Sequence, residues 1–172
     1  GGWKEELGLN AEKAFEAYKK VFHECLPGKL KELDPSRPYW PSSPSASYDE
    51  QPEISRGDFH YWDLVKTIQP YTVYAENVGR FMSEYGFKSY PLLSEVKKFI
   101  GPDALDLRSE AMEEHQGWET GADLVEKNLE WFYPQAGNFE SLLYQSQLLQ
   151  ADAIQFAIEA HRAAKPRCMG TL

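Results

Sequence analysis

The fold of this chain is decided by residues 80–87, which read Arg80-Phe81-Met82-Ser83-Glu84-Tyr85-Gly86-Phe87. A mostly apolar run ends in one carboxylate, and a Tyr-Gly turn follows it directly. This pattern is typical of a strand that carries an acidic residue to its carboxyl end, at the mouth of an α/β barrel. The stretch therefore predicts a strand over residues 80–85 and a candidate site at the end of that strand.

Around this strand, the sequence alternates short strands with helical segments. Apolar residues at helical spacing, a capping Asn10 and a stop at Pro27-Gly28 predict a helix over residues 11–25. A stretch rich in Pro and Ser predicts a long loop over residues 41–52. The other expected elements are a short helix at 29–33, strands at 39–40, 59–62 and 168–172, a surface segment at 65–78, and helices at 89–99, 109–116, 121–132 and 138–164.

Strands separated by helical connections indicate a parallel α/β sheet. Four strands alone would leave a sheet with two open edges, and open edges favour further pairing. We therefore expect the chain to be part of a larger barrel. We also expect it to associate with the rest of that barrel or with a copy of itself, because apolar faces would otherwise be exposed.

The composition narrows the possible partners and cofactors. Hydrophobic residues make up 42% of the chain and charged residues 26%, which is typical of a globular protein. The net charge of −9 argues against a nucleic-acid or anionic-membrane surface, and the sequence has no transmembrane stretch. Cys25 and Cys168 show no metal-ligand spacing, so no structural zinc is expected. Two free thiols and a disulfide both remain open.

Three motifs stand in order along the chain. They are Arg37-Pro38-Tyr39-Trp40-Pro41-Ser42-Ser43-Pro44, Gly57-Asp58-Phe59-His60-Tyr61-Trp62 and the stretch at residues 80–87. Together they resemble the catalytic (β/α)8 TIM barrel of the family 2 glycoside hydrolases, in the β-mannosidase branch. The resemblance implies that residues 1–172 form the C-terminal portion of such a barrel, roughly strands five to eight with their helices.

The resemblance also implies a mechanism. In a retaining glycosidase one carboxylate attacks the anomeric carbon, and a second carboxyl group protonates the leaving oxygen. Glu84 resembles the nucleophile. The family's acid/base belongs to an Asn-Glu pair, and no such dipeptide occurs here, so we expect it upstream of this chain. Asp58 and Glu53 precede a strand, at the non-catalytic end, and are rejected as proton donors. No metal and no organic cofactor are implied.

The remaining site residues are expected on the same resemblance. Tyr61 is the candidate to hold the nucleophile, and His60 is a second donor. Trp40 and Trp62 offer flat faces on which a pyranose ring can stack, and Ser42 could bond to a sugar hydroxyl. Each has a structural alternative: the tryptophans as core residues, His60 as a structural histidine, and the loop of Ser42 as a plain connection.

The leading hypothesis is a retaining exo-β-mannosidase that removes terminal β-linked mannose from oligosaccharides, with this piece inactive by itself. Two alternatives stay open. One is a non-catalytic carbohydrate-binding or assembly module, and the other is a sister exo-β-glycosidase acting on glucosaminides or galactosides. Residues 63–67 lack the aromatic side chains expected after the His-Tyr-Trp motif, which leaves the preferred leaving group open.

Overall fold

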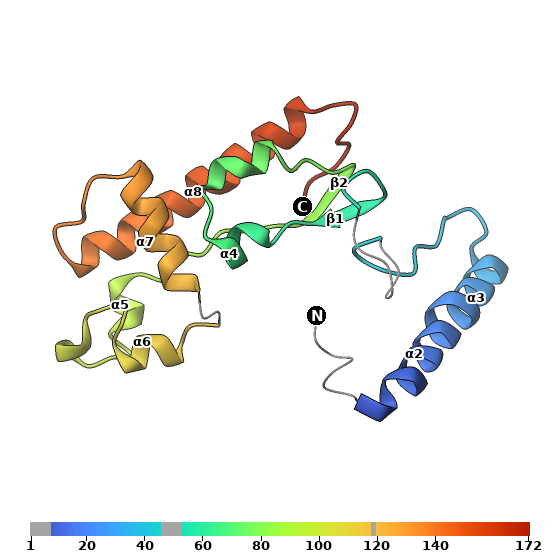
Figure 1. The fold of residues 1–172 in the computed structure, drawn as a ribbon, viewed down its shortest axis with the longest axis horizontal. Coiled ribbons are helices and arrows are strands. Elements are labelled where there is room, and N and C mark those ends of the chain that lie inside the picture. The colour runs from blue at the N-terminus through green and yellow to red at the C-terminus, as the bar shows by residue number, and fades with distance from the viewer. Residues whose placement is uncertain (1–7, 46–52, 118–119) are drawn as a thin grey trace. The chain divides into compact units, whose positions relative to one another are not determined.

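The computed structural model describes residues 8–45, 53–117 and 120–172 (Figure 1). The chain forms two compact units, Gly1–Glu53 and Ile54–Leu172. Each unit has its own pattern of secondary structure and burial, so the two are described one after the other.

In the first unit, one helical path continues through the expected stop at Pro27-Gly28. After the short 3-10 turn η1 (Gly8–Asn10), the path comprises α2 (Ala11–Lys19), the π-helical η2 (Lys20–Cys25) and α3 (Leu26–Leu33). The predicted end is wrong because Pro27 lies in the first turn of α3, where its missing N–H costs little. The wider π turn just before it bonds Leu26 N to Val21 O.

This helical path buries none of its described side chains. An apolar set stays exposed, consisting of Val21, Phe22, Leu26, Leu30 and Leu33. The expected cap at Asn10 is also wrong. Its backbone already has helical dihedrals, φ −91° and ψ −6°, and its side chain makes no capping hydrogen bond. An N-cap residue needs an extended backbone to turn its side chain back onto the first turn.

The strand expected at Tyr39-Trp40 is absent, since both residues are irregular. A strand is defined by backbone pairing with a neighbour. Within the part of the chain that the structure describes, no strand pairs with these two residues. The predicted loop at 41–52 begins as irregular chain through residue 45, and its remainder lies outside the described residues.

The second unit contains a small parallel sheet (Figure 1). Strand β1 (Asp58–His60) pairs in parallel with β2 (Phe81–Glu84). Thr171 extends the sheet through an isolated parallel bridge to Met82. The expected strands at 59–62, 80–85 and 168–172 are thus found in shortened form. Parallel pairing across helical connections confirms the α/β class.

The connection between the two strands was predicted as a surface segment at 65–78, and it is only partly at the surface, because Val65 and Tyr74 are buried. It contains α4 (Asp63–Thr67) and the 3-10 turn η3 (Tyr71–Ala75). Leu64 and Tyr74 are fully inaccessible to solvent. The apolar residues of this segment show no regular spacing, because two short helices of different pitch lie within it. Neither helix is long enough to show a full amphipathic repeat.

After β2, short helical segments are followed by two longer helices. They are α5 (Leu93–Val96), the 3-10 turn η4 (Pro102–Ala104), α6 (Glu110–Glu114), α7 (Gly121–Phe132) and α8 (Phe139–Ala163). The predicted helices at 121–132 and 138–164 are confirmed almost residue by residue. Helix α8 packs against η3 and α7 and contributes Leu143, Leu149, Ala153 and Ala157 to the core.

Polar side chains of α8 fix the segment that follows β2. Gln150 Nε2 donates to Phe87 O at 2.6 Å, and Gln147 Nε2 donates to Tyr90 O at 2.9 Å. The hydroxyl of Ser146 accepts from Tyr90 N at 3.0 Å. These bonds satisfy the backbone of an irregular buried segment. They therefore hold the chain rigidly just beyond Glu84.

Candidate functional site

Glu84 is the last residue of β2, and its carboxylate receives two nitrogen partners. Trp62 Nε1 donates to Glu84 Oε2 at 3.1 Å. His60 Nδ1 lies 3.2 Å from the same oxygen. Oε1 has no partner among the described residues, and 52% of the side chain is exposed. One oxygen is thus anchored, and about half of the side chain is open to solvent.

A local irregularity in the sheet brings these residues together. Asp58 pairs with Phe81 and Phe59 with Met82, but His60 pairs with Glu84. Ser83 is therefore an extra residue on β2, which is a β-bulge. Bulges are uncommon in parallel pairs and often redirect a side chain beside a functional site. Here the bulge places Glu84, rather than Ser83, level with His60.

A second carboxylate lies on the far side of His60. Asp58 Oδ2 is 3.8 Å from His60 Nε2. The same Asp58 oxygen accepts a hydrogen bond from Ser83 Oγ at 2.6 Å. Sequence reasoning treated Asp58 only as a rejected proton donor and missed this contact. The two-residue spacing of Asp58 and His60 was the available signal, because residues i and i+2 of a strand share one face.

The position of the Trp62 indole depends on Gly86. A Cβ atom at residue 86 would lie 3.1 Å from the Trp62 ring, closer than most real Cβ contacts. The Gly86 carbonyl is fixed in turn by the Tyr74 hydroxyl, which donates to it at 2.6 Å. The Tyr-Gly turn after Glu84 thus lets the half-buried indole lie close to the backbone and reach the carboxylate.

Tyr61 does not contact the Glu84 carboxylate with its hydroxyl. Its side chain is buried, and its hydroxyl accepts from Asn77 Nδ2 at 3.0 Å. Burial, followed by the charges of Asp63 and Glu76, raises the pKa of Tyr61. Strand alternation explains the outcome, because Tyr61 and His60 are consecutive and face opposite sides. Only the backbone of Tyr61 reaches Glu84, through a 2.9 Å bond from its N to Glu84 O.

Trp40 and Ser42 belong to the first unit. The indole of Trp40 is exposed. Ser42 Oγ donates to Pro44 O at 2.9 Å, within a turn that contains a cis Ser43-Pro44 peptide. The exposed indole of Trp40 is available for stacking on a sugar ring. The roles of Trp40 and Ser42 in sugar binding stay predictions.

A buried polar chain lies behind the site, next to Glu84 in sequence. Thr171 Oγ1 donates to the Tyr85 hydroxyl at 2.8 Å and lies 2.9 Å from His161 Nδ1. The Tyr85 ring meets the His161 ring edge to face, with centroids 4.9 Å apart. His161 Nε2 is buried with no hydrogen-bond partner among the described residues. Burial lowers the pKa of His161.

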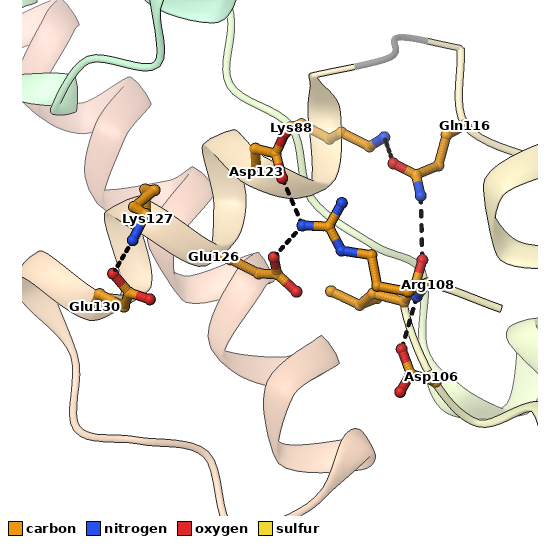
Figure 2. Close-up of polar contacts among 9 residues, drawn as sticks. Lys88, Asp106, Arg108, Gln116, Asp123, Glu126, Lys127 and Glu130 are labelled. Atoms are coloured by element: carbon orange, nitrogen blue, oxygen red, sulfur yellow. Dashed lines mark hydrogen bonds and ion pairs between the residues drawn. The ribbon is translucent and has the colours of Figure 1, made fainter.

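A charged cluster joins α7 to the loop before α6 (Figure 2). Arg108 Nη2 bonds to Asp123 Oδ1 at 2.5 Å and also to Glu126. These hydrogen bonds raise the pKa of Arg108, so it stays charged. Nearby, Lys88 Nζ donates to Gln116 Oε1 at 3.0 Å, and burial lowers the pKa of Lys88. The cluster fastens the helices that follow β2 to one another.

Other features carry less chemistry. Across residues 8–45, 53–117 and 120–172, no three His, Cys, Asp or Glu side chains are grouped to hold a metal ion. None of the helices in those residues is both long and apolar enough to cross a membrane. A hollow of about 800 Å³ runs along α8, lined by residues including Gln150, Ile154 and Arg162. It has no acid pair, so Glu84 remains the candidate site.

Comparisons with known proteins find β-mannosidases both by structure and by sequence. A β-D-mannosidase from Dictyoglomus thermophilum superimposes with a TM-score of 0.80 and 29% identity, over 90% of this chain and 19% of that one. The chain resembles the β-mannosidases. Beta-mannosidase B from Aspergillus flavus is 25% identical over 148 residues, and the Aspergillus niger protein is 26% identical over 152.

These matches cover most of this chain but little of each relative. Both Aspergillus alignments include 83% of the chain and 17% of the relative. No family model matches the chain. The β-mannosidases are glycoside hydrolases, so the resemblance is to a class of enzymes. It agrees with the family that the three sequence motifs indicated.

Proposed function

We propose that this chain is the C-terminal portion of the catalytic barrel of a retaining exo-β-mannosidase, with Glu84 as the nucleophile. The observation that carries the proposal is the position of Glu84 at the carboxyl end of a parallel strand, with one carboxylate oxygen anchored and the side chain half exposed. Active sites of α/β barrels lie at this end of the strands.

The two contacts suit a nucleophilic carboxylate. Both nitrogen contacts fall on Oε2, so they orient the carboxylate and leave Oε1 without a protein partner among the described residues. Glu84 Oε1 would attack the anomeric carbon and form a glycosyl ester, while the aglycone oxygen leaves with a proton from a second carboxyl group. Water would then cleave the ester. The proton donor is expected about 5–5.5 Å from Glu84 in a retaining enzyme.

We assign that donor to a residue outside this chain. The family places it in an Asn-Glu pair, and the sequence contains no such dipeptide. Asp58 is a poor substitute, because it starts β1 and its carboxylate is engaged by Ser83. In this proposal β1, β2 and the Thr171 strand are strands six, seven and eight of the barrel. The Tyr39-Trp40 segment corresponds in sequence to strand five, although it pairs with no strand among the described residues.

The substrate in this proposal is a β-mannoside oligosaccharide. Trp62 carries a flat indole beside the nucleophile, and Trp40 and Ser42 supply further sugar contacts. The partner is the rest of the barrel or, without it, a copy of this chain. Phe81 and Met169, beside the sheet, expose large apolar side chains that such a partner would cover. A stable monomer in light scattering of this chain at micromolar concentration would contradict that association.

The direct test is hydrolysis of an activated aryl β-mannoside. This chain would be compared with a longer protein that includes the whole barrel. We expect activity only in the longer protein, and we expect Glu84→Ala to lower kcat by at least about 10³-fold. Glu95→Gln, an exposed acid paired with Lys98, is the matched control and should retain activity.

A 2-fluoro-mannoside that forms a stable glycosyl ester checks the nucleophile separately. Peptide mapping should find the label on Glu84. A label on another acid would overturn the assignment of the nucleophile while leaving the sugar specificity intact. Activity of the short chain would instead show that it contains its own proton donor. Turnover of glucosaminides or galactosides, with none of mannosides, would favour a sister enzyme.

A further inference from the structure

His60 lies between two carboxylates, and only one of them is the proposed nucleophile. Its Nδ1 is 3.2 Å from Glu84 Oε2, and its Nε2 is 3.8 Å from Asp58 Oδ2. Since a carboxylate oxygen is an acceptor, the Nδ1 facing Glu84 is assigned a proton. The separation on the Asp58 side exceeds a hydrogen bond, so that contact acts through charge.

Asp58 is held in place by the residue that forms the bulge. Ser83 Oγ donates to Asp58 Oδ2 at 2.6 Å, and this is the oxygen that faces His60. The backbone of Ser83 moves Glu84 level with His60, while its side chain fixes the acid on the other side of the ring. Ser83 thus determines the positions of both carboxylates beside the imidazole, Glu84 on one side and Asp58 on the other.

We propose that Asp58 and Ser83 are positioning residues that hold the His60 imidazole against the Glu84 carboxylate. The inference rests on the proposed function, because it gives these residues a purpose in the reaction of Glu84. Neither residue touches the sugar or the reacting atoms in this scheme. Both act through the orientation of the His60 ring.

The burial of Asp58, His60 and Glu84 agrees with a role for Asp58 in positioning the His60 ring. The side chains of Asp58 and His60 are each 16% exposed, whereas that of Glu84 is 52% exposed. A charge sheltered from solvent is screened less than an exposed one, so Asp58 influences His60 strongly for its distance. With a proton on each ring nitrogen, the ring is held with Nε2 toward Asp58 and Nδ1 toward Glu84.

The reaction makes a second, fixed anion useful. Glu84 gives up its charge when its oxygen bonds to the anomeric carbon, and it recovers that charge when water cleaves the ester. Through this cycle the attraction between His60 and Glu84 weakens and returns. Asp58 takes no part in the covalent steps and keeps its charge, so it holds the ring in place while Glu84 is esterified.

The test uses Asp58→Asn, Ser83→Ala and Ser83→Thr in the form of the protein that hydrolyses aryl β-mannosides. Loss of an outer partner of a catalytic group typically costs about 10–100-fold in activity. We expect Asp58→Asn and Ser83→Ala to lower kcat within this range and to change KM by less than about twofold. Ser83→Thr keeps the hydroxyl and should restore most of kcat.

Asp63→Asn is the matched control, because Asp63 is an exposed acid close by that pairs with Lys66. It should leave kcat unchanged. A loss of kcat in Asp63→Asn equal to that in Asp58→Asn would overturn the proposal, as would full activity in both Asp58→Asn and Ser83→Ala. If Asp58→Asn does not fold, the Ser83→Ala and Ser83→Thr pair decides the question.

The ring of His60 can also be read directly in this chain, without any substrate. Two-dimensional NMR of the imidazole nitrogens, assigned with a His60→Gln variant, should show a proton on Nδ1 and a changed pattern in Asp58→Asn. An identical pattern in wild type and Asp58→Asn would overturn the inference. This measurement separates the two claims, since it holds or fails even if no form of the protein hydrolyses a mannoside.

Discussion

The helical path over residues 11–33 and helix α8 both carry apolar side chains at helical spacing. These side chains are exposed in the first and covered in the second. In α8 the apolar stripe is covered, and six of its residues are buried, including Leu143, Leu149 and His161. In α2, η2 and α3 no described residue is buried. An amphipathic pattern therefore predicts that a helix forms, and it leaves open which surface will cover the apolar face.

The largest expected effect comes from cutting back a buried leucine in the second unit. Leu64 is fully buried in α4, and Leu64→Ala should lower the free energy of unfolding by about 2–5 kcal/mol, because a cavity remains. Leu30 of α3 is 39% exposed, and Leu30→Ala should change stability by less than about 0.5 kcal/mol. Urea unfolding followed by circular dichroism measures both.

An equal loss in both variants would break this contrast between the two units. It would show that, in solution, another protein surface packs against the apolar side chains of α3 and buries Leu30. Running the same pair in the longer barrel protein sharpens the test. There the cost of Leu30→Ala should rise if the rest of the barrel provides that surface.

Two asparagines at the predicted starts of helices, Asn10 and Asn138, provide a smaller contrast. Asn138 has an extended backbone and accepts from Ser141 N at 2.9 Å, whereas Asn10 makes no side-chain cap bond. Asn138→Ala should therefore cost about 1 kcal/mol. Asn10→Ala should leave stability nearly unchanged. Thermal unfolding of the two variants against wild type checks this, and a larger loss in Asn10→Ala would refute the cap assignment.

Much of the second unit was predictable because its signals are local. The apolar run before Glu84 predicted β2, and Asn138 marked the start of α8. His60 was expected beside Glu84 only through the resemblance of the three motifs, and Trp62 was expected to stack on a sugar rather than to donate to Glu84. Strand β2 and helix α8 depend on the chain's own pattern and on one parallel pairing.

The rest depended on pairings that a sequence does not display. The bulge at Ser83 is set by hydrogen bonding to β1, and it decides which residue faces His60. Tyr61 reads as a site residue beside His60, but strand alternation turns its ring into the core. Pro27 reads as a helix stop, but a π turn just before it lets the helix continue.

The smallest effect is a loss of stability at acidic pH. It arises from His161, which is buried in the second unit. Burial lowers the pKa of His161, so as pH falls below about 6.5 the unfolded state binds a proton that the folded state refuses. Stability should therefore decrease from about pH 6.5 down to the folded-state pKa and level off below it. Tyr85 and Thr171 face the ring, and neither carries a charge that would offset this. His161→Phe should flatten that part of the stability profile, and an unaltered slope in His161→Phe would contradict the assignment.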